Sequence, residues 1–263
     1  MYKRQDISIL KDLGYDVLLS NRIFDSLLFW KYDILFSYFY RYSFFAALLA
    51  KCFGKKTYFT GGIDSLDSDY ASAFNYKIQA LFFKLCYWVA DSCIIVSQSD
   101  LKNIFKVSSL KKKLSYSEHV INTKLFIADV PKEKIFTSIV WMGDEGNVVR
   151  KGVDKALQIF AELKKIPEFV DYRFVIIGRK GEGEVLVRSI IDKYNLKGSV
   201  ELKGEVSEED KINLLKQSKY YFQLSLYEGF GLAALEALCA NNIIIHSGTV
   251  SYTHLTLPTN SRV

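Results

Sequence analysis

The chain has 263 residues, of which 49% are hydrophobic and 24% charged, and its formal net charge is +6. This balance is typical of globular proteins and excludes a chain that is disordered over most of its length. The length suits one large domain or two modest ones. Four scattered cysteines, with no C-x-x-C pair and no histidine cluster beside them, argue against a disulfide framework or a zinc site and favour a reducing cytosol.

In the first half, short apolar runs alternate with amphipathic stretches, which is typical of strands separated by helices. The expected strands cover residues 15–20, 33–37, 56–60 and 92–97. The expected helices are one that ends at Gly14 and three at residues 44–52, 76–90 and 99–105. A linker at residues 127–133 then separates this half from a second series of the same kind.

The second half repeats the alternation. Its expected strands cover residues 135–142, 172–178, 200–204, 220–224 and 243–246. Its expected helices cover residues 153–165, 184–195, 207–217 and 231–240. Because strands connected through helices pair in parallel, the sequence predicts an α/β fold with two doubly wound domains, an N-terminal one at residues 6–128 and a C-terminal one at residues 132–249.

The two ends of the chain can be encoded by one short DNA sequence read on opposite strands. The codons GTG-TAT-AAG-AGA-CAG encode residues 1–5. Their reverse complement, read in another frame, encodes residues 250–253 and supplies the first base of the codon for His254, within the run from residue 250 to 254. Both ends resemble the translation of a transposon-end sequencing adapter, so we leave residues 1–5 and 250–263 out of the expected fold. We expect the natural part to be an internal piece of a longer protein.

Without these ends the charge argument changes. They hold Lys3, Arg4 and Arg262 but no acidic residue, so the net charge falls from +6 to +3. A small positive excess of this kind does not indicate binding to nucleic acid. We therefore expect no nucleic-acid partner.

The stretch at residues 27–53 is rich in aromatic residues and raises the question of a membrane segment. Its uncharged runs are broken by Lys31, Asp33, Arg41 and Lys51. None of them reaches the roughly 18 apolar residues that a spanning helix needs. Two interpretations stay open: a core strand and a core helix, or an interfacial surface that meets a lipid-linked acceptor.

The most informative segment is residues 225–238, S-L-Y-E-G-F-G-L-A-A-L-E-A-L, which follows a strand and opens a helix. Gly229 and Gly231 let the backbone approach a ligand closely. The amides around Gly231 and Leu232 then lie at a helix N-terminus, where a diphosphate binds well. Phe230 lies between the two glycines.

Two carboxylates flank this turn. Glu228 precedes the helix and Glu236 follows eight residues later on it. Carboxylates accept charge-assisted hydrogen bonds from sugar hydroxyls, so the pair can bind two hydroxyl-bearing groups. The ordinary alternative is two solvated acids, which fits Glu236 less well because Leu235 and Ala237 flank it.

These residues resemble a known family, the retaining glycosyltransferases of the GT-B fold, family 4, also called glycosyl transferases group 1. That family carries E-x7-E within a sequence close to S-x-x-E-G-F-G. Further segments resemble its motifs: A-D-S-C-I-I-V-S at 90–97, V-I-N-T-K-L-F at 120–126, K-G-V-D at 151–154 and V-I-I-G at 175–178. The resemblance covers about residues 12–248.

The resemblance implies a fold and an activity. The fold would be two Rossmann-like domains that face a cleft, both truncated here, with the first strand and the last helices missing. Residues 6–128 would form the acceptor-side domain and residues 132–249 the domain that binds the nucleotide sugar. The activity would be transfer of a sugar from a nucleotide-diphosphate donor to a glycan or lipid-linked acceptor with retention of anomeric configuration. The expected place is the cytoplasm, with peripheral contact at the inner face of the cell membrane left open.

The resemblance also implies roles for single residues. Glu236 would hold the donor ribose, Glu228 the hydroxyls of the transferred hexose, and Lys151 the diphosphate, as phosphate chemistry also requires. The remaining donor-side candidates are Arg150, Gly229, Phe230, Gly231, Leu232, Leu202 and Lys203. The family's usual G-R is replaced by M-G-D-E at residues 142–145. Either Arg150 substitutes for this arginine, or the diphosphate is bound more weakly or by another arrangement. The nucleobase would pack near Leu202 and Lys203.

Three groups have weaker assignments. Asp64 is a candidate catalytic residue facing the sugar and acceptor, or else the N-cap of a helix. His119 and His246 fit ordinary surface or core positions at least as well as a site. No cofactor or metal is expected, because the only D-x-D spacing, at residues 67–69, lies in a polar loop.

Other activities remain open or disfavoured. A GT-B nucleotide-sugar epimerase is one alternative, and a truncated, non-catalytic nucleotide-sugar binder is another. A nicotinamide-dependent dehydrogenase is disfavoured because no G-x-G-x-x-G opens a helix after a strand.

Overall fold

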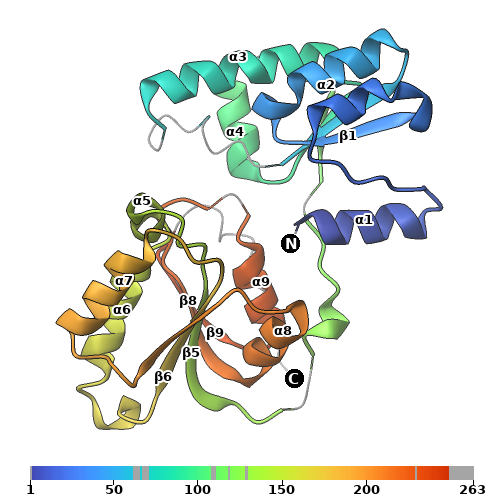
Figure 1. Cartoon of the computed structure of the whole chain (residues 1–263). Helices are drawn as coiled ribbons and strands as arrows, with labels where there is room; N and C mark the ends of the chain where they lie inside the picture. The colour runs from blue at the N-terminus through green and yellow to red at the C-terminus, as the bar shows by residue number, and fades with distance from the viewer. Residues whose placement is uncertain are drawn as a thin grey trace. The chain divides into compact units, whose positions relative to one another are not determined.

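In a computed structural model, the chain divides into two compact units, residues 1–121 and 122–263 (Figure 1). The structure describes residues 2–61, 66, 71–107, 111–117, 119–127, 130–228 and 230–248. Each unit contains a parallel sheet with helices packed on it. The α/β fold with two parallel sheets is therefore confirmed.

The first unit has a four-stranded sheet in the order β1-β2-β3-β4, with every neighbouring pair parallel. Its strands are β1 (Ile34–Tyr38), β2 (Lys56–Thr60), β3 (Ser92–Ile95) and β4 (Leu114–Tyr116). Its helices are α1 (Tyr2–Asp12), α2 (Tyr40–Cys52), α3 (Ala73–Val89) and α4 (Gln98–Val107). The order of the described strands follows the chain without a reversal.

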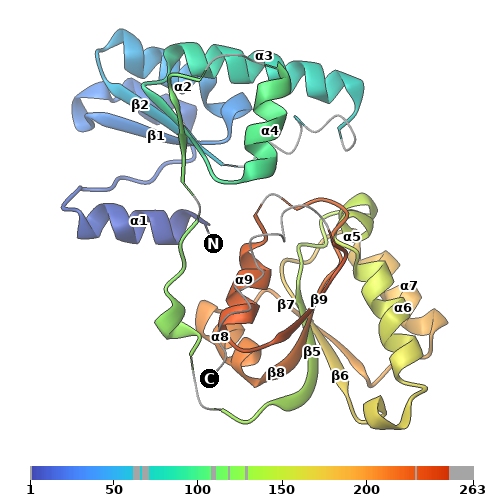
Figure 2. The same cartoon turned by 180° about the vertical axis from the view of Figure 1, so that it is seen from behind.

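Helices α2 and α3 lie side by side over this sheet, as Figures 1 and 2 show from opposite sides. The core beneath them is aromatic, since the ring of Tyr40 lies 5.4 Å from that of Phe59 and 5.2 Å from that of Phe83. All three side chains are fully buried. The stretch at residues 27–53 thus supplies a strand and a helix to the core, while Phe45 and Phe53 of the same stretch stay exposed.

The strand expected at residues 15–20 is wrong. The chain there is irregular, and Leu18 and Leu19 are 69% and 66% exposed. A short apolar run does not distinguish a strand from an apolar loop unless a neighbouring strand pairs with it, and β1 pairs with β2 alone. Helix α1 begins at Tyr2, within the residues left out of the expected fold.

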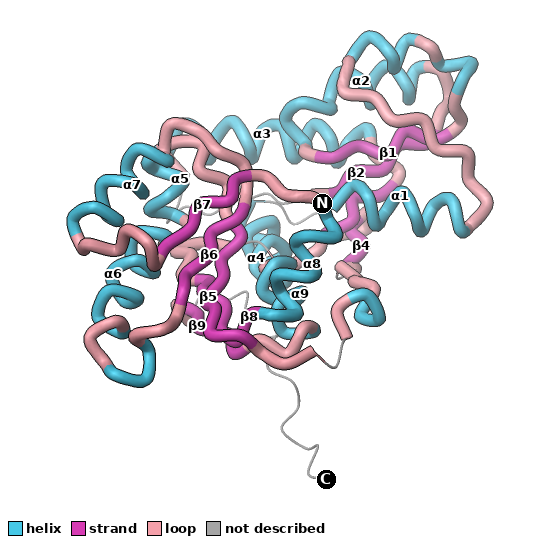
Figure 3. Tube along the Cα trace, turned by 60° about the horizontal axis from the view of Figure 1, so that its bottom comes forward, coloured by secondary structure: helices cyan, strands magenta, loops and turns pink. Residues whose placement is uncertain are grey.

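The second unit has a five-stranded parallel sheet in the order β7-β6-β5-β8-β9 (Figure 3). Its strands are β5 (Glu133–Ile139), β6 (Arg173–Ile177), β7 (Val200–Gly204), β8 (Ser218–Gln223) and β9 (Ile243–His246). Its helices are α5 (Glu145–Arg150), α6 (Val153–Leu163), α7 (Glu184–Lys193), α8 (Glu208–Gln217) and α9 (Leu232–Cys239). The order reverses between β5 and β8, so this sheet is doubly wound.

Helices cover both faces of the second sheet, with α6 and α7 on one side and α8 and α9 on the other (Figures 1 and 2). Because successive strand residues point to opposite faces, Phe136, Phe174 and Phe222 pack together in the core that includes α6 and α7. Tyr221 packs on the other side with Leu215, Ala234 and Ala237 of α8 and α9. Phe126, in the chain that leads into β5, packs in this second group.

Most element boundaries lie within a few residues of the prediction, and β2, β7 and β9 match it residue for residue. The short elements α5 and β4 are not predicted. Among the described residues, no helix combines the length and the apolarity needed to cross a bilayer.

Candidate functional site

The candidate site lies where the strand order of the second sheet reverses. Ligands of open α/β sheets bind beyond the carboxyl ends of the strands at such a point. The segment after β5 carries Arg150 and Lys151, and the loop after β8 carries Glu228. Two segments 77 residues apart in sequence are therefore brought to one place.

Gly152 fixes the first of these segments against the second. It follows Lys151, the C-cap of α5, and is the N-cap of α6, with φ +67°, a left-handed conformation that favours glycine. A Cβ at this position would lie 2.1 Å from the carbonyl oxygen of Leu224, just after β8. In addition, the amide of Leu226 donates to the carbonyl of Arg150 at 2.8 Å. The K-G pair is thus held directly against the loop that carries Glu228.

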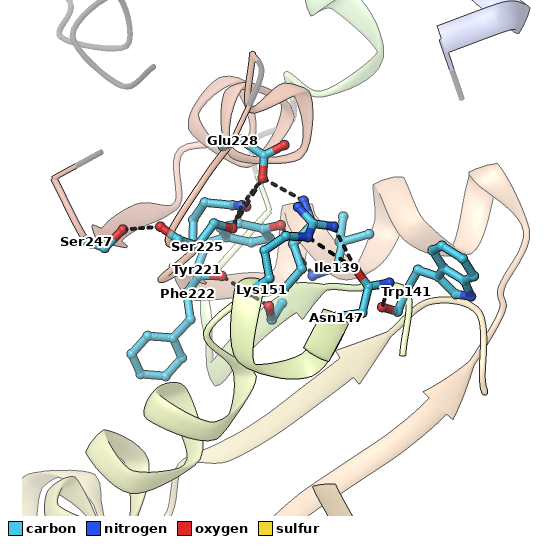
Figure 4. A network of polar contacts seen from close by, with 12 residues as sticks. Ile139, Trp141, Asn147, Lys151, Tyr221, Phe222, Ser225, Glu228 and Ser247 are labelled. Carbon is cyan, nitrogen blue, oxygen red and sulfur yellow. Dashed lines mark hydrogen bonds and ion pairs between the residues drawn. The ribbon is translucent and has the colours of Figure 1, made fainter. Parts of the chain in front are cut away.

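Lys151 and Glu228 form an ion pair. The Lys151 Nζ lies 2.6 Å from Glu228 Oε2, and the side chains are 20% and 10% exposed. The same oxygen accepts from Gln223 Nε2 at 3.0 Å and Ser225 Oγ at 3.2 Å. Figure 4 shows the donors meeting one oxygen of Glu228, while its other oxygen points away from them. Glu228 is therefore no solvated loop acid, and Oε1 is left without a hydrogen bond in the described part of the chain.

Arg150 is held by a different partner. Its Nε and Nη2 donate to Asn147 Oδ1 at 3.2 and 2.8 Å, and Asn147 Nδ2 in turn donates to the carbonyl of Trp141 (Figure 4). Asp144 caps α5 by accepting from the amide of Asn147 at 2.6 Å. The segment that lacks the family's arginine thus forms a capped turn, and Arg150 is fixed beside Lys151.

Helix α9 begins directly after the Glu228 loop. Gly231 is its N-cap, with φ +79°. Leu232 is the first helical residue, and both Leu232 and Phe230 are buried. The amides of a helix's first turn have no acceptor within the helix, and they carry the positive end of its dipole. Gly229 lies outside the described residues.

Glu236 occupies a separate, buried position on α9. The residue is 1% exposed, so the solvated alternative does not hold. Its Oε2 accepts from Lys211 Nζ of α8 at 2.9 Å, and its Oε1 has no hydrogen-bond partner among the described residues. Burial raises the pKa of Glu236, while Lys211 opposes that rise. The two carboxylates of the E-x7-E motif thus have different lysine partners.

The remaining predicted residues lie away from this pair or cannot be placed. Leu202 lines an open depression of about 400 Å³ between α7 and β7, whose lining includes neither Lys151 nor Glu228. Lys203 is also on β7, and its Nζ lies 3.9 Å from Glu201 Oε1. His119 belongs to the first unit, and burial lowers its pKa. His246, in contrast, lies next to the site: it is exposed at the end of β9, in register with Gln223, which donates to Glu228. Asp64 and residues 67–69 lie outside the described residues.

No group of three or more histidine, cysteine or acidic side chains that could hold a metal ion occurs within the described ranges. The four cysteines are free thiols, of which Cys86 and Cys93 are buried. Burial raises the pKa of Cys93 to about 12, so this thiol stays protonated at neutral pH.

Sequence reasoning missed two polar partners, Gln223 and Lys211, and gave no role to Ser225, which is the serine of the S-x-x-E-G-F-G motif. Gln223 is the last residue of β8, where nothing marks one strand residue as facing a site. Lys211 did carry a signal, because it shares the spacing i, i+3, i+4 with Leu214 and Leu215 on the buried face of α8. A lysine on the apolar side of an amphipathic helix indicates a buried charge pair.

Comparisons with known proteins agree with this architecture. Residues 146–255 match the family described as glycosyl transferases group 1. The chain is 34% identical over 109 residues, 41% of its length, to a GDP-mannose:cellobiosyl-diphosphopolyprenol alpha-mannosyltransferase of Xanthomonas oryzae. It is 33% identical over 90 residues, 34% of its length, to one chain of the human phosphatidylinositol N-acetylglucosaminyltransferase. It spans 28% and 18% of these relatives' lengths.

Solved structures extend the likeness to both units. HepE of Anabaena, in complex with UDP and glucose, superposes with a TM-score of 0.71 at 12% identity, covering 89% of this chain and 64% of that one. The chain therefore has the fold of the GT-B glycosyltransferases, and its residues 146–255, which hold Lys151, Glu228 and Glu236, match the glycosyl transferases group 1 family.

Proposed function

We propose that the protein of which this chain is a part transfers a hexose from a nucleoside-diphosphate donor to a hydroxyl of a glycan or lipid-linked acceptor, with retention at the anomeric carbon. The observation that carries the proposal is the Lys151–Glu228 pair, set at the reversal of strand order beside the first turn of α9. This arrangement puts a cation and free amides where a diphosphate binds, and a carboxylate beside them for the sugar.

In this reaction the bond between the anomeric carbon and the phosphate oxygen breaks and a bond to the acceptor oxygen forms. The proton of the acceptor hydroxyl passes to a phosphate oxygen of the leaving group and from there to water. The nucleoside diphosphate leaves with increased negative charge. Lys151 and the amides of α9 stabilise that charge, and Arg150 lies next to them in sequence. Glu228 Oε1, which lacks a partner in the described part of the chain, accepts from hydroxyls of the sugar.

The relatives support a nucleotide-sugar donor but name different ones. The Xanthomonas protein is named for GDP-mannose and a diphosphopolyprenol-linked acceptor, and HepE is described with UDP and glucose. We propose the shared chemistry, a nucleoside diphosphate sugar, without choosing the base. A lipid-linked acceptor is the proposed partner on the other side of the reaction.

No metal is needed in this proposal, because Lys151 and the helix amides supply the positive charge that a bound cation would otherwise provide. We expect donor turnover to be the same with and without EDTA. A loss of turnover in EDTA that Mg²⁺ or Mn²⁺ restores would contradict this part of the proposal.

The test is hydrolysis or transfer from a panel of UDP-, GDP- and ADP-sugars, measured for the wild-type chain, Lys151→Met and Glu228→Gln. Removing an electrostatic contact of this kind lowers turnover by about 100-fold or more. Lys155→Met, which removes an exposed lysine four residues away, is the matched control and should keep wild-type turnover. Equal rates in all four proteins would refute the assignment of the site.

The same assay separates the alternatives. An epimerase would convert the donor sugar to a stereoisomer still attached to the nucleotide, whereas a transferase or hydrolase releases the nucleoside diphosphate. A non-catalytic binder would bind the nucleotide sugar and produce neither. The anomeric configuration of the product, read by NMR, tests retention.

Peripheral membrane contact is part of the proposal. On α3 the exposed side chains Phe74, Leu81 and Trp88 recur every seven residues, with Lys77 and Lys84 between them. Apolar rings beside lysines suit the surface of an anionic bilayer. We expect the chain to sediment with phosphatidylglycerol vesicles more than with phosphatidylcholine vesicles, and Phe74→Ser combined with Trp88→Ser to abolish the difference.

A further inference from the structure

Lys211 is a buried cation for which the proposed chemistry gives no role so far. It lies in the first turn of α8 and is 3% exposed. Lysine is almost never fully buried unless its charge is paired. Here the Nζ lies 2.5 Å from Glu208 Oε1 and 2.9 Å from Glu236 Oε2, and it stands 5.8 Å from the centre of the Phe126 ring. Three neighbours thus fix the ammonium in place.

The carboxylate that Lys211 holds is only half satisfied. Oε2 of Glu236 is the oxygen bound to Lys211, whereas Oε1 is buried and has no hydrogen-bond partner in the residues that the structure describes. A buried acceptor without a donor costs free energy. If the ion pair served stability alone, both oxygens would be expected to have donors. The unsatisfied oxygen instead indicates a donor that comes from a ligand.

We propose that Lys211 is a positioning residue of the donor site, which orients the Glu236 carboxylate through Oε2 so that Oε1 accepts the ribose hydroxyls of the donor. The inference rests on the proposed function, which assigns the ribose to Glu236. It adds a residue that acts through Glu236 and touches no substrate itself.

Lys211 also affects whether the Glu236 carboxyl is ionised. The groups that act on Glu236 within the described chain are Lys211 and Glu208 of α8 and Cys239 of its own helix. Burial and Glu208 raise the pKa of Glu236, and Lys211 is what opposes them. An ionised carboxylate is the stronger acceptor for a hydroxyl, and the contact with Lys211 favours this form of Glu236.

The experiment measures how strongly the chain prefers a ribose with both hydroxyls. The ligands are UDP and GDP, and then the 2′,3′-dideoxy form of whichever binds the wild-type chain more tightly. The measured quantity is the ratio of the two dissociation constants by calorimetry. If the ribose hydroxyls donate to an ionised Glu236, the wild-type chain should bind the ordinary nucleotide about 10-fold or more tightly than the dideoxy form. We expect the ratio to fall below about 3-fold in Glu236→Gln and in Lys211→Met, and to stay near the wild-type value in Lys211→Arg.

Two controls separate positioning from stability. Lys216→Met removes another lysine of α8 and should leave the ratio unchanged. A merely structural role of Lys211 would weaken both ligands equally and keep the ratio. If Lys211→Met does not fold, Lys211→Gln replaces it, and the ratio of dissociation constants is measured as a function of pH. The ratio should fall to half its maximum at a higher pH in Lys211→Gln than in the wild type, because the lysine that lowers the pKa of Glu236 is gone.

The failures are distinguishable. A ratio that falls in Glu236→Gln but persists in Lys211→Met, or a midpoint pH that does not move in Lys211→Gln, overturns the role of Lys211. An unchanged ratio in Glu236→Gln overturns the ribose assignment in the proposed function. A wild-type chain that binds neither UDP nor GDP overturns the proposed function and this inference with it.

Discussion

At the scale of single residues, Gly152 carries the geometry of the site. It sits at φ +67°, and the carbonyl of Leu224 leaves no room for a Cβ. Gly152→Ala therefore combines a strained backbone with a contact that only a shift of the chain can relieve. We expect a loss of unfolding free energy of about 2 to 3 kcal/mol, and a donor affinity reduced at least as much as in Lys151→Met, because the shift separates Lys151 from Glu228.

Chemical denaturation and calorimetry with the better-binding nucleotide measure the two effects. Gly198→Ala is a useful comparison, since Gly198 also has a positive φ, +84°, but a Cβ there meets nothing within 4 Å. Gly198→Ala should lower the free energy of unfolding through backbone strain alone and should leave nucleotide affinity unchanged. Wild-type stability and affinity in Gly152→Ala would show that this contact does not position Lys151.

At the scale of elements, α8 and α9 are joined by the buried pair of Lys211 and Glu236. Breaking a buried pair by removing one partner is costly, whereas replacing both partners is much less so. Lys211→Met alone should lose about 3 kcal/mol of unfolding free energy. The double variant Lys211→Met with Glu236→Gln should be more stable than Lys211→Met, and a double-mutant cycle by urea denaturation measures the coupling.

The pH dependence of that pair has a defined sign. The pKa of Glu236 is raised in the folded chain, so the folded state binds this proton more tightly than the unfolded state. The contribution of Glu236 to stability is therefore full below the pKa of an unfolded glutamate, about 4.3, and is lost as the pH rises through the raised value. Relative to Glu236→Gln, the wild-type chain should lose stability as the pH rises above about 4.3 and through the raised pKa of Glu236. A difference that grows in the opposite direction would mean that the Lys211 contact outweighs burial.

The accuracy of the secondary structure predicted from the sequence differs from element to element. The strands β2, β7 and β9 match their predictions because clear turn residues flank each short segment. β9 is an apolar run, β2 is rich in threonine and aromatic residues, and β7 alternates apolar and charged residues. Residues 15–20 read the same way but find no partner strand, and pairing is a long-range property that a local pattern does not contain. The six residues of α5 are too few to show a helical period, so the sequence does not predict this short helix, which Asp144 caps just before Lys151.

In the candidate site, too, the sequence predicts local features but not the contacts between distant segments. The motif placed Glu228 and Glu236 by spacing, yet spacing could not tell that one pairs with Lys151 and the other with Lys211. Those partners come from the end of α5 and from α8, which the sheet brings against β8 and α9 only after folding. Contacts between elements that are distant in sequence are what the pattern leaves open.

At the scale of the whole molecule, the donor-side residues that the structure describes all belong to residues 122–263. That unit has its own buried clusters on both faces of its sheet, including the one that contains Phe126. The core of the first unit, around Tyr40, Phe59 and Phe83, is composed of residues from the first unit alone. The two units therefore have the means to fold separately.

We expect residues 122–263, produced alone, to fold cooperatively and to bind the better of UDP and GDP with a dissociation constant within about threefold of the full chain, since threefold corresponds to less than about 1 kcal/mol. Sugar transfer should be lost, because the first unit is the expected acceptor side, while nucleotide binding remains. Calorimetry on the two proteins and circular dichroism of the shorter one test this. If the shorter protein folds but its affinity is tenfold or more weaker, residues of the first unit contribute to nucleotide binding, and the assignment of the donor to the second unit alone is wrong.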